Sequence, residues 1–200
     1  DHFDKTNLKK FKNKNIKIII KNFKNKRLKS KIAELGFKNI IECEEWKKYK
    51  LSKDLSIAII PQVSSNSSNE TDEINYDLDT SIVIQSNLTK KIFYNNVDNP
   101  LGLKDLRKVR TFVKKEFKRN IDLCCLPAGA AGEYPQCFLN INREQEKNKI
   151  INSHLKTLAK QIKVLKVKNF FHAGGIYTIY GKFHLLNELI AAPNEKQINN

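Results

Sequence analysis

Two short apolar runs joined by a polar turn constrain the fold of this chain more than any other feature. Residues Ser81 to Gln85 alternate in polarity and are rich in Ile and Val, and Lys91 to Tyr94 form a second short run. Alternation with a period of two is typical of β-strands. The sequence therefore predicts a β-hairpin whose far end delivers Asn95, Asn96 and Asp98 into a loop ahead of Pro100.

Asp98 admits two interpretations. A carboxylate that follows a buried strand is held by a rigid element and can still point into a cavity, which suits a metal ligand. An aspartate in a turn also commonly accepts hydrogen bonds from its own backbone. Both interpretations stay open on this stretch alone.

Apolar runs and helical patterns alternate along the chain. The runs predict further strands at Ile16–Ile20, Phe37–Glu42, Leu55–Ile60, Ile121–Leu126 and within Val164–Phe171, with strand or turn at Trp46–Leu51. Helical spacing predicts helices near Asp4, at Lys26–Leu35, Leu103–Arg119 and Asn142–Ile162, and a last helix at Phe183–Ala191. Such alternation indicates an α/β fold, here one domain spanning 1–200. Functional loops are expected at the strand ends, namely Asp98, residues 127–138 and His172.

Composition narrows the class of protein. The formal charge of +16 invites a nucleic-acid interpretation. The lysines, however, are spread along the chain among many asparagines and few interleaved aromatics, so nucleic-acid binding stays a secondary alternative.

No apolar run reaches the roughly 18 residues of a membrane span, and no secretory signal is present. The adjacent Cys124 and Cys125 lie in an apolar run, which predicts buried thiols in a reducing compartment and a cytoplasmic location. There is no methionine, so we expect Asp1 to follow a removed leader or to begin a fragment.

Four carboxylates and imidazoles are candidate metal ligands because each lies at the end of a predicted element: Asp1, His2, Asp98 and His172. The glycines that follow His172 allow a backbone to approach a bound group closely. By contrast, His154 and His184 sit within helical patterns and are expected to be structural. The chain has no phosphate-binding loop, dinucleotide fingerprint or nucleophile elbow.

The order of these residues resembles that of the metallo-β-lactamase superfamily. Asp1-His2 is similar to the last two letters of its H-x-H-x-D-H motif, Asp98 in NNVDNP to its later aspartate, and His172 in FFHAGG to its final histidine. The segments LPAGAAGEYPQCF and AGGIYTIYGKFHLLNELIAAP are similar to the branch of CMP-N-acetylneuraminate hydroxylase-like and N-acyl-phosphatidylethanolamine phospholipase D-like proteins. The resemblance implies a four-layer αββα sandwich, incomplete at its N-terminus, of which this chain is the C-terminal part.

The same resemblance implies a function. Asp1, His2, Asp98 and His172 would bind a divalent transition metal, most simply zinc, with iron or manganese as alternatives, and Asp1 would orient a water or take its proton. A small anionic substrate, such as a phosphorylated or nucleotide-linked sugar, would contact residues of the late loops: Glu133, Tyr134, Tyr177 and Lys182.

Two departures leave alternatives open. The first two histidines of the motif would precede Asp1, and no histidine occurs between Leu55 and Asp79, where the family has its third. We therefore weigh a metal-dependent hydrolase-like protein against a metal-free relative that acts as a binding or structural module, and against a basic nucleic-acid-binding domain. A chain of these 200 residues is expected to be inactive even if its parent is an enzyme.

Overall fold

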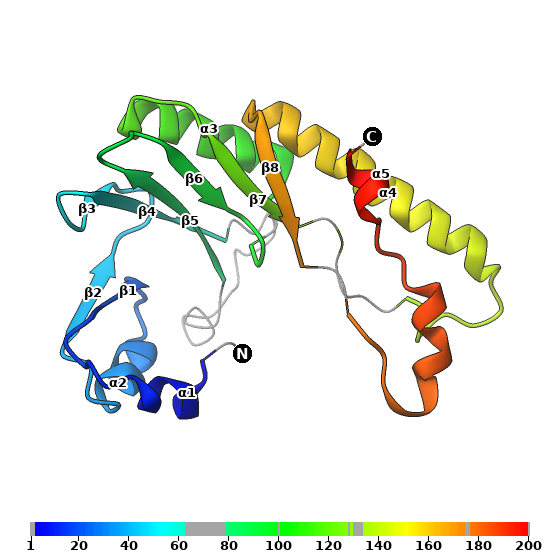
Figure 1. Ribbon diagram of the computed structural model, residues 1–200, viewed down its shortest axis with the longest axis horizontal. Helices are drawn as coiled ribbons and strands as arrows, with labels where there is room; N and C mark the ends of the chain where they lie inside the picture. The colour runs from blue at the N-terminus through cyan, green and yellow to red at the C-terminus, as the bar shows by residue number, and fades with distance from the viewer. Residues whose placement is uncertain are drawn as a thin grey trace.

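The computed structural model describes residues 3–62, 79–99, 101–127, 129, 134–174 and 177–199 (Figure 1). Its main sheet has the strand order β3-β4-β5-β6-β7-β8. The strands are β3 (Tyr49–Lys50), β4 (Leu55–Pro61), β5 (Thr80–Ser86), β6 (Ile92–Asn95), β7 (Leu123–Pro127) and β8 (Asn169–Ala173). Strands β3 to β6 pair antiparallel, whereas β6, β7 and β8 are parallel. The predicted α/β class is confirmed.

The predicted hairpin forms the centre of this sheet. Strand β5 pairs antiparallel with β6, and the two are joined by a turn in which Lys90 has a φ of 61°. Burial alternates along β5, where Val83 is fully buried on one face and Ile84 is half-buried on the other. This alternation is what the period-two pattern predicts for a strand with two different faces.

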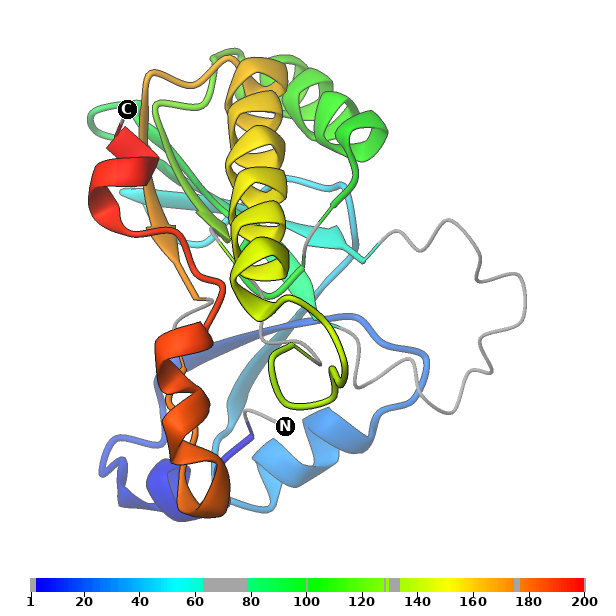
Figure 2. The same ribbon diagram turned by 90° about the vertical axis from the view of Figure 1, so that its right-hand side faces the viewer.

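Helices α3 (Leu103–Phe117) and α4 (Arg143–Leu165) cover one face of the sheet (Figures 1 and 2). Each helix connects two adjacent parallel strands, α3 from β6 to β7 and α4 from β7 to β8. The main core lies between them and the sheet, and its fully buried members include Val83, Tyr94, Leu106, Val109, Val113, Leu126 and Leu165. The helices also contact each other directly, since Arg110 Nη1 donates to the carbonyl of Val164 at 2.7 Å.

A small parallel sheet lies against the other face of the main sheet. Strands β1 (Lys17–Lys21) and β2 (Asn39–Cys43) are joined by α2 (Arg27–Ala33), and α1 (Lys5–Lys10) precedes them with Asp4 as its N-cap. A second apolar cluster forms where these strands meet β4 and β5, and it comprises Cys43, Ile57 and Ile59 with the half-buried Ile19, Ile41, Ile82 and Ile84.

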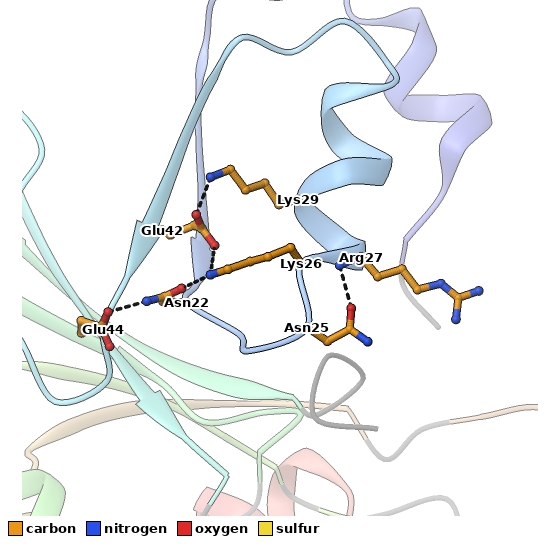
Figure 3. Close-up of polar contacts among 7 residues, drawn as sticks. All are labelled: Asn22, Asn25, Lys26, Arg27, Lys29, Glu42 and Glu44. Carbon is orange, nitrogen blue, oxygen red and sulfur yellow. Dashed lines mark hydrogen bonds and ion pairs between the residues drawn. The ribbon is translucent and has the colours of Figure 1, made fainter. Parts of the chain in front are cut away.

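One carboxylate ties α2 to the small sheet (Figure 3). Glu42 on β2 accepts hydrogen bonds from Lys26 Nζ at 2.7 Å and from Lys29 Nζ at 2.5 Å. Lys26 also contacts Asn22, whose amide donates in turn to Glu44. The hydrogen bonds from Lys26 and Lys29 lower the pKa of Glu42 despite its partial burial.

Two predicted boundaries near the C-terminus were wrong. Helix α4 continues to Leu165 and ends at Lys166, whose φ is 56°, so the strand begins only at Asn169. Leu165 is fully buried in the core, and the energy of that packing extends the helix by one turn. The predicted last helix is a 3-10 helix, η2 (Gly181–Leu189), and the short helix α5 (Glu195–Asn199) follows it. Asn187 holds η2 by bonding both backbone groups of Ile179.

The face of β6 to β8 that points away from α3 and α4 is apolar and partly exposed. Phe93 and Phe171 stack on it with ring centroids 6.0 Å apart. Phe171 is 45% exposed and Leu123 on the strand between them is 38% exposed. Contiguous apolar surface of this kind commonly marks a region that another element covers.

Candidate functional site

The carboxyl ends of β6, β7 and β8 meet at one edge of the sheet. In the parallel register, Asn95 pairs with Cys125, and Cys125 pairs with Phe171. Asp98 lies three residues beyond Asn95, and His172 lies one residue beyond Phe171. Neighbouring strands are about 4.8 Å apart, so two strand spacings, about 10 Å, separate the backbones of β6 and β8. The backbones that carry Asp98 and His172 therefore leave the sheet at the same edge.

The loops that follow β6 and β8 are in contact. Gly174 has a φ of +77°, and a β-carbon built on it would lie 3.4 Å from Cγ1 of Val97. Burial raises the pKa of Cys125, and the Asp98 carboxylate raises it further. The Asp98 carboxylate is therefore close enough to Cys125, at the end of β7, to affect its pKa. The loop that carries Asp98 also lies beside the loop that follows His172.

A buried polar network lies beneath the loop that carries Asp98. The hydroxyls of Ser81 and Tyr94 both donate to Asn96 Oδ1, at 2.9 and 2.8 Å, and Asn99 Nδ2 donates to Ser81 Oγ at 2.9 Å. Asn96 and Asn99, which flank the Asp98 loop position, are both fully buried. Buried hydrogen bonds of this kind fix the backbone on either side of an exposed residue.

The network is not saturated. Within the part of the chain that the structure describes, Asn96 Nδ2 and Asn99 Oδ1 have no hydrogen-bond partner. Asn99 Nδ2 additionally contacts the carbonyl of Pro61 at 3.2 Å, which ties the loop to the end of β4. Asp98 itself is exposed at the surface above these amides, and His172 is half-buried.

The predicted substrate-contacting residues occupy different settings. Tyr134 is buried, and its hydroxyl donates to the carbonyl of Arg143 at 2.7 Å. The hydroxyl of Tyr177 donates to the carbonyl of Tyr134 at 2.8 Å. Lys182 is exposed, with Nζ 4.9 Å from the centre of the Phe183 ring. Both tyrosine hydroxyls thus bind backbone groups, which joins the segment around 134 to the segment around 177.

Several predicted site residues lie outside the described residues. They are Asp1, His2 and Glu133. Within the described ranges, no group of three or more His, Cys, Asp and Glu side chains is placed to hold a metal ion. The carboxylate of Asp98 and the imidazole of His172 suit zinc, iron or manganese as two members of a ligand set, but they do not complete one.

Sequence reasoning missed the buried amides. The sequence predicts Asn96 in a loop, which it is, but neither its full burial nor that of Asn99 is predicted. The sequence feature that indicates this burial is the pair of asparagines on either side of Asp98 in NNVDNP, directly after an apolar strand. His154 was expected to be structural, and it is a half-buried residue of α4 whose pKa is lowered by burial.

The chain was compared with known proteins. No protein-family model matches it, and none of the curated proteins does. A point mutant of the CmlA beta-hydroxylase is similar in structure, with a TM-score of 0.51, 10% identity, and coverage of 78% of this chain and 31% of that one. At 10% identity, this likeness shows a shared fold over most of the chain.

Two further structures are more distant. One is CmlA itself, a diiron beta-hydroxylase from Streptomyces venezuelae, with a TM-score of 0.49 and 10% identity over 92% of this chain and 35% of that one. The other is an isothiocyanate hydrolase from Delia radicum gut bacteria, with a TM-score of 0.47 and 16% identity over 80% of this chain and 53% of that one. This chain therefore spans between about a third and about a half of the structures that it resembles.

None of the helices in the described part of the chain is both long enough and apolar enough to cross a bilayer.

Proposed function

We propose that this chain is the C-terminal part of a metal-dependent, hydrolase-like protein of the metallo-β-lactamase fold. In this proposal Asp98 and His172 are two ligands of one divalent metal, and Asp1 and His2 supply the others. The observation that carries the proposal is the shared sheet edge, where the loops after β6 and β8 touch through Val97 and Gly174. The structural likeness to CmlA supports the fold.

A bound divalent metal would supply Lewis-acid activation of water. The chain's own residues would do the rest. The buried amides of Asn96 and Asn99 would fix the backbone that presents Asp98, and Asp1 would accept a proton from the attacking water. Zinc is the simplest metal for one carboxylate-and-imidazole set, and iron and manganese suit the same donors.

The substrate would be a small anionic molecule, such as a phosphorylated or nucleotide-linked sugar. Lys182 supports this part of the proposal, because it is exposed and follows Tyr177 closely in the chain. Glu133 belongs to the same proposed surface. In this arrangement the two hydrogen-bonded tyrosine hydroxyls would hold the loop in place, and Lys182 would attract the anion.

The same proposal assigns a role to the open face of the sheet. Phe93, Leu123 and Phe171 form an apolar surface on the side away from α3 and α4. Strands β1 and β2 already cover the neighbouring part of that side, over β4 and β5. We propose that a second sheet covers the remainder in the whole protein, which gives four layers in the order αββα.

Metal binding by the purified protein tests the proposal. Equilibrium dialysis against Zn²⁺ and Fe²⁺ should show one tightly bound ion, and Asp98→Ala or His172→Ala should each weaken binding about 100-fold or more. Asp105→Ala and His184→Ala are matched controls, because these residues lie on α3 and η2 and belong to no proposed ligand set. Equal loss in the controls, or no bound ion in the unaltered protein, would reject the proposal.

A metal-free relative is the second candidate, and two observations favour it. The segment Leu55 to Asp79 has no histidine, and the described residues contain no group of three or more metal-binding side chains. Such a protein would keep the fold as a binding module. It predicts that no variant at Asp98 or His172 changes metal content.

A further inference from the structure

A pocket of about 400 Å³ lies at the opposite edge of the main sheet from Asp98 and His172. Its lining residues lie at and just before β3, in the turn before β4 and at the start of that strand, and in the turn between β5 and β6: Lys48, Lys50, Lys53, Ser56, Asn87 and Lys90. All six side chains are polar and four carry a positive charge. The volume falls within the range of pockets that bind small molecules.

The base of this pocket is built from fixed polar groups. Ser56 is 2% exposed, and its hydroxyl donates to Asn87 Oδ1 at 2.9 Å. Lys48 Nζ donates to Oε1 of the buried Gln85 at 2.8 Å. The backbone of Asn87 is held as well, since its N–H donates to the carbonyl of Asp54 at 2.7 Å. The base is therefore preorganised, which lowers the cost of ordering it around a ligand.

The positive charge of the pocket is not neutralised by the described residues. No carboxylate lines it, and no ion pair involving Lys50, Lys53 or Lys90 is formed among the residues that the structure describes. Glu116 acts on Lys48 from outside the pocket, but burial and the charge of Lys90 outweigh it and lower the pKa of Lys48. Four like charges around one space repel one another, and a bound anion would relieve that repulsion.

We propose that this pocket binds a small anion that carries two or more phosphate groups. Four lysines line one space, and phosphate oxygens accept charge-assisted hydrogen bonds from lysine. Asn87, whose Oδ1 accepts from Ser56, can add an Nδ2–H donor for the same oxygens. A single phosphate carries fewer charges than the four lysines that line the pocket, so a polyphosphate is the matching class of ligand. The site is separate from the proposed metal site and stands independently of it.

Lys90 offers a variant that removes a charge without disturbing the fold. Its φ of 61° lies in the left-handed region that glycine adopts without strain, so Lys90→Gly removes the ammonium group and relieves the backbone. Lys166 is a matched control because it is also a lysine with a φ of 56°, and it lies outside the pocket at the end of α4. Lys166→Gly makes the same change in net charge and backbone preference elsewhere.

Isothermal titration of the full chain with tripolyphosphate at about 0.15 M salt tests the proposal. We expect one binding site, a dissociation constant about tenfold higher for Lys90→Gly, and a change of less than about twofold for Lys166→Gly. Inorganic phosphate, titrated in parallel, should bind more weakly than tripolyphosphate. Equal weakening in both variants would show diffuse attraction to a basic surface and overturn the proposal.

A single-stranded oligonucleotide distinguishes a small polyphosphate from a nucleic-acid backbone. If tripolyphosphate competes with it at one site and Lys90→Gly weakens both, the pocket recognises phosphate chemistry as proposed. No detectable tripolyphosphate binding at about 1 mM would overturn the proposal, whether or not the oligonucleotide binds.

Discussion

Gly174 and Val97 lie in contact although they are far apart in the chain, since a β-carbon built on Gly174 would stand 3.4 Å from Val97 Cγ1. The contact joins the loop after β8, which follows His172, to the loop after β6, which carries Asp98. Gly174 has a φ of +77°, so its backbone also favours glycine. The backbone conformation therefore restricts this position, while an added methyl group would stand in van der Waals contact with Val97.

Gly174→Ala tests whether this contact positions the two loops. The left-handed φ alone should cost about 1 kcal/mol of stability, and the new methyl group would stand in van der Waals contact with Val97. Gly181→Ala is the matched control, because Gly181 has a φ of +70° and nothing within 4 Å of an added β-carbon. Urea unfolding should show a similar loss in both variants, whereas metal affinity should fall only in Gly174→Ala. Equal metal affinity in the two variants would show that this contact does not position the metal-binding residues.

Tyr94→Phe tests the network beneath the Asp98 loop. The substitution removes the hydroxyl that donates to Asn96 Oδ1 at 2.8 Å, so we expect a loss of about 1–2 kcal/mol in the free energy of unfolding. Tyr180→Phe should change stability by less than about 0.5 kcal/mol, because Tyr180 is 84% exposed. Urea denaturation of both variants measures this difference, and an equally small effect at Tyr94 would count against a stabilising network.

Protonation of Glu42 should account for part of the stability that the fold loses at low pH. The hydrogen bonds from Lys26 and Lys29 lower the pKa of Glu42 from its ordinary value of 4.5. The stabilisation is therefore complete above that value and is lost as the pH falls through the lower pKa of the folded state. Glu42→Gln should reduce stability at pH 7 and flatten its decline below about pH 4.5. Glu146→Gln is the control, because Glu146 pairs with the exposed Lys149 one helical turn away on the same helix. Parallel pH profiles for Glu42→Gln and the unaltered protein would contradict the assignment.

The four thiols should differ in reactivity. Cys43, Cys124 and Cys125 are buried, and burial raises the pKa of each, that of Cys124 to about 12. Cys137 is exposed. Titration of the native protein with a disulfide reagent at pH 8 should therefore modify one thiol rapidly, and Cys137→Ser should abolish that phase. Rapid reaction of two or more thiols in the folded protein would contradict the burial of the other three.

The fold could be predicted from the sequence wherever local pattern and tertiary packing agree. The β5–β6 hairpin and helix α3 follow directly from periods of two and 3.6 residues. The end of α4 could not be predicted, because it is set by the burial of Leu165 in the tertiary core rather than by a Gly or Pro. The 3-10 geometry of η2 depends likewise on the side chain of Asn187 and its bonds to Ile179.

The candidate site was predictable only in part. The strand ends that carry Asp98 and His172 follow from the pattern of apolar runs, and the parallel order of β6, β7 and β8 brings them to one edge. The buried network around Asn96 and the basic pocket around Lys48 depend on pairing across strands distant in sequence. No local pattern encodes such pairing, so neither feature was predicted.

A double-mutant cycle on Asp98 and His172 tests the central claim most directly, because residues that share one ion cannot act independently. Metal dissociation constants would be measured for the unaltered protein, Asp98→Ala, His172→Ala and the double variant. If both side chains bind one ion, the double variant should bind metal little more weakly than either single variant, with a coupling of at least about 1 kcal/mol. Additive losses within about 0.5 kcal/mol, or no loss in either single variant, would contradict a shared site.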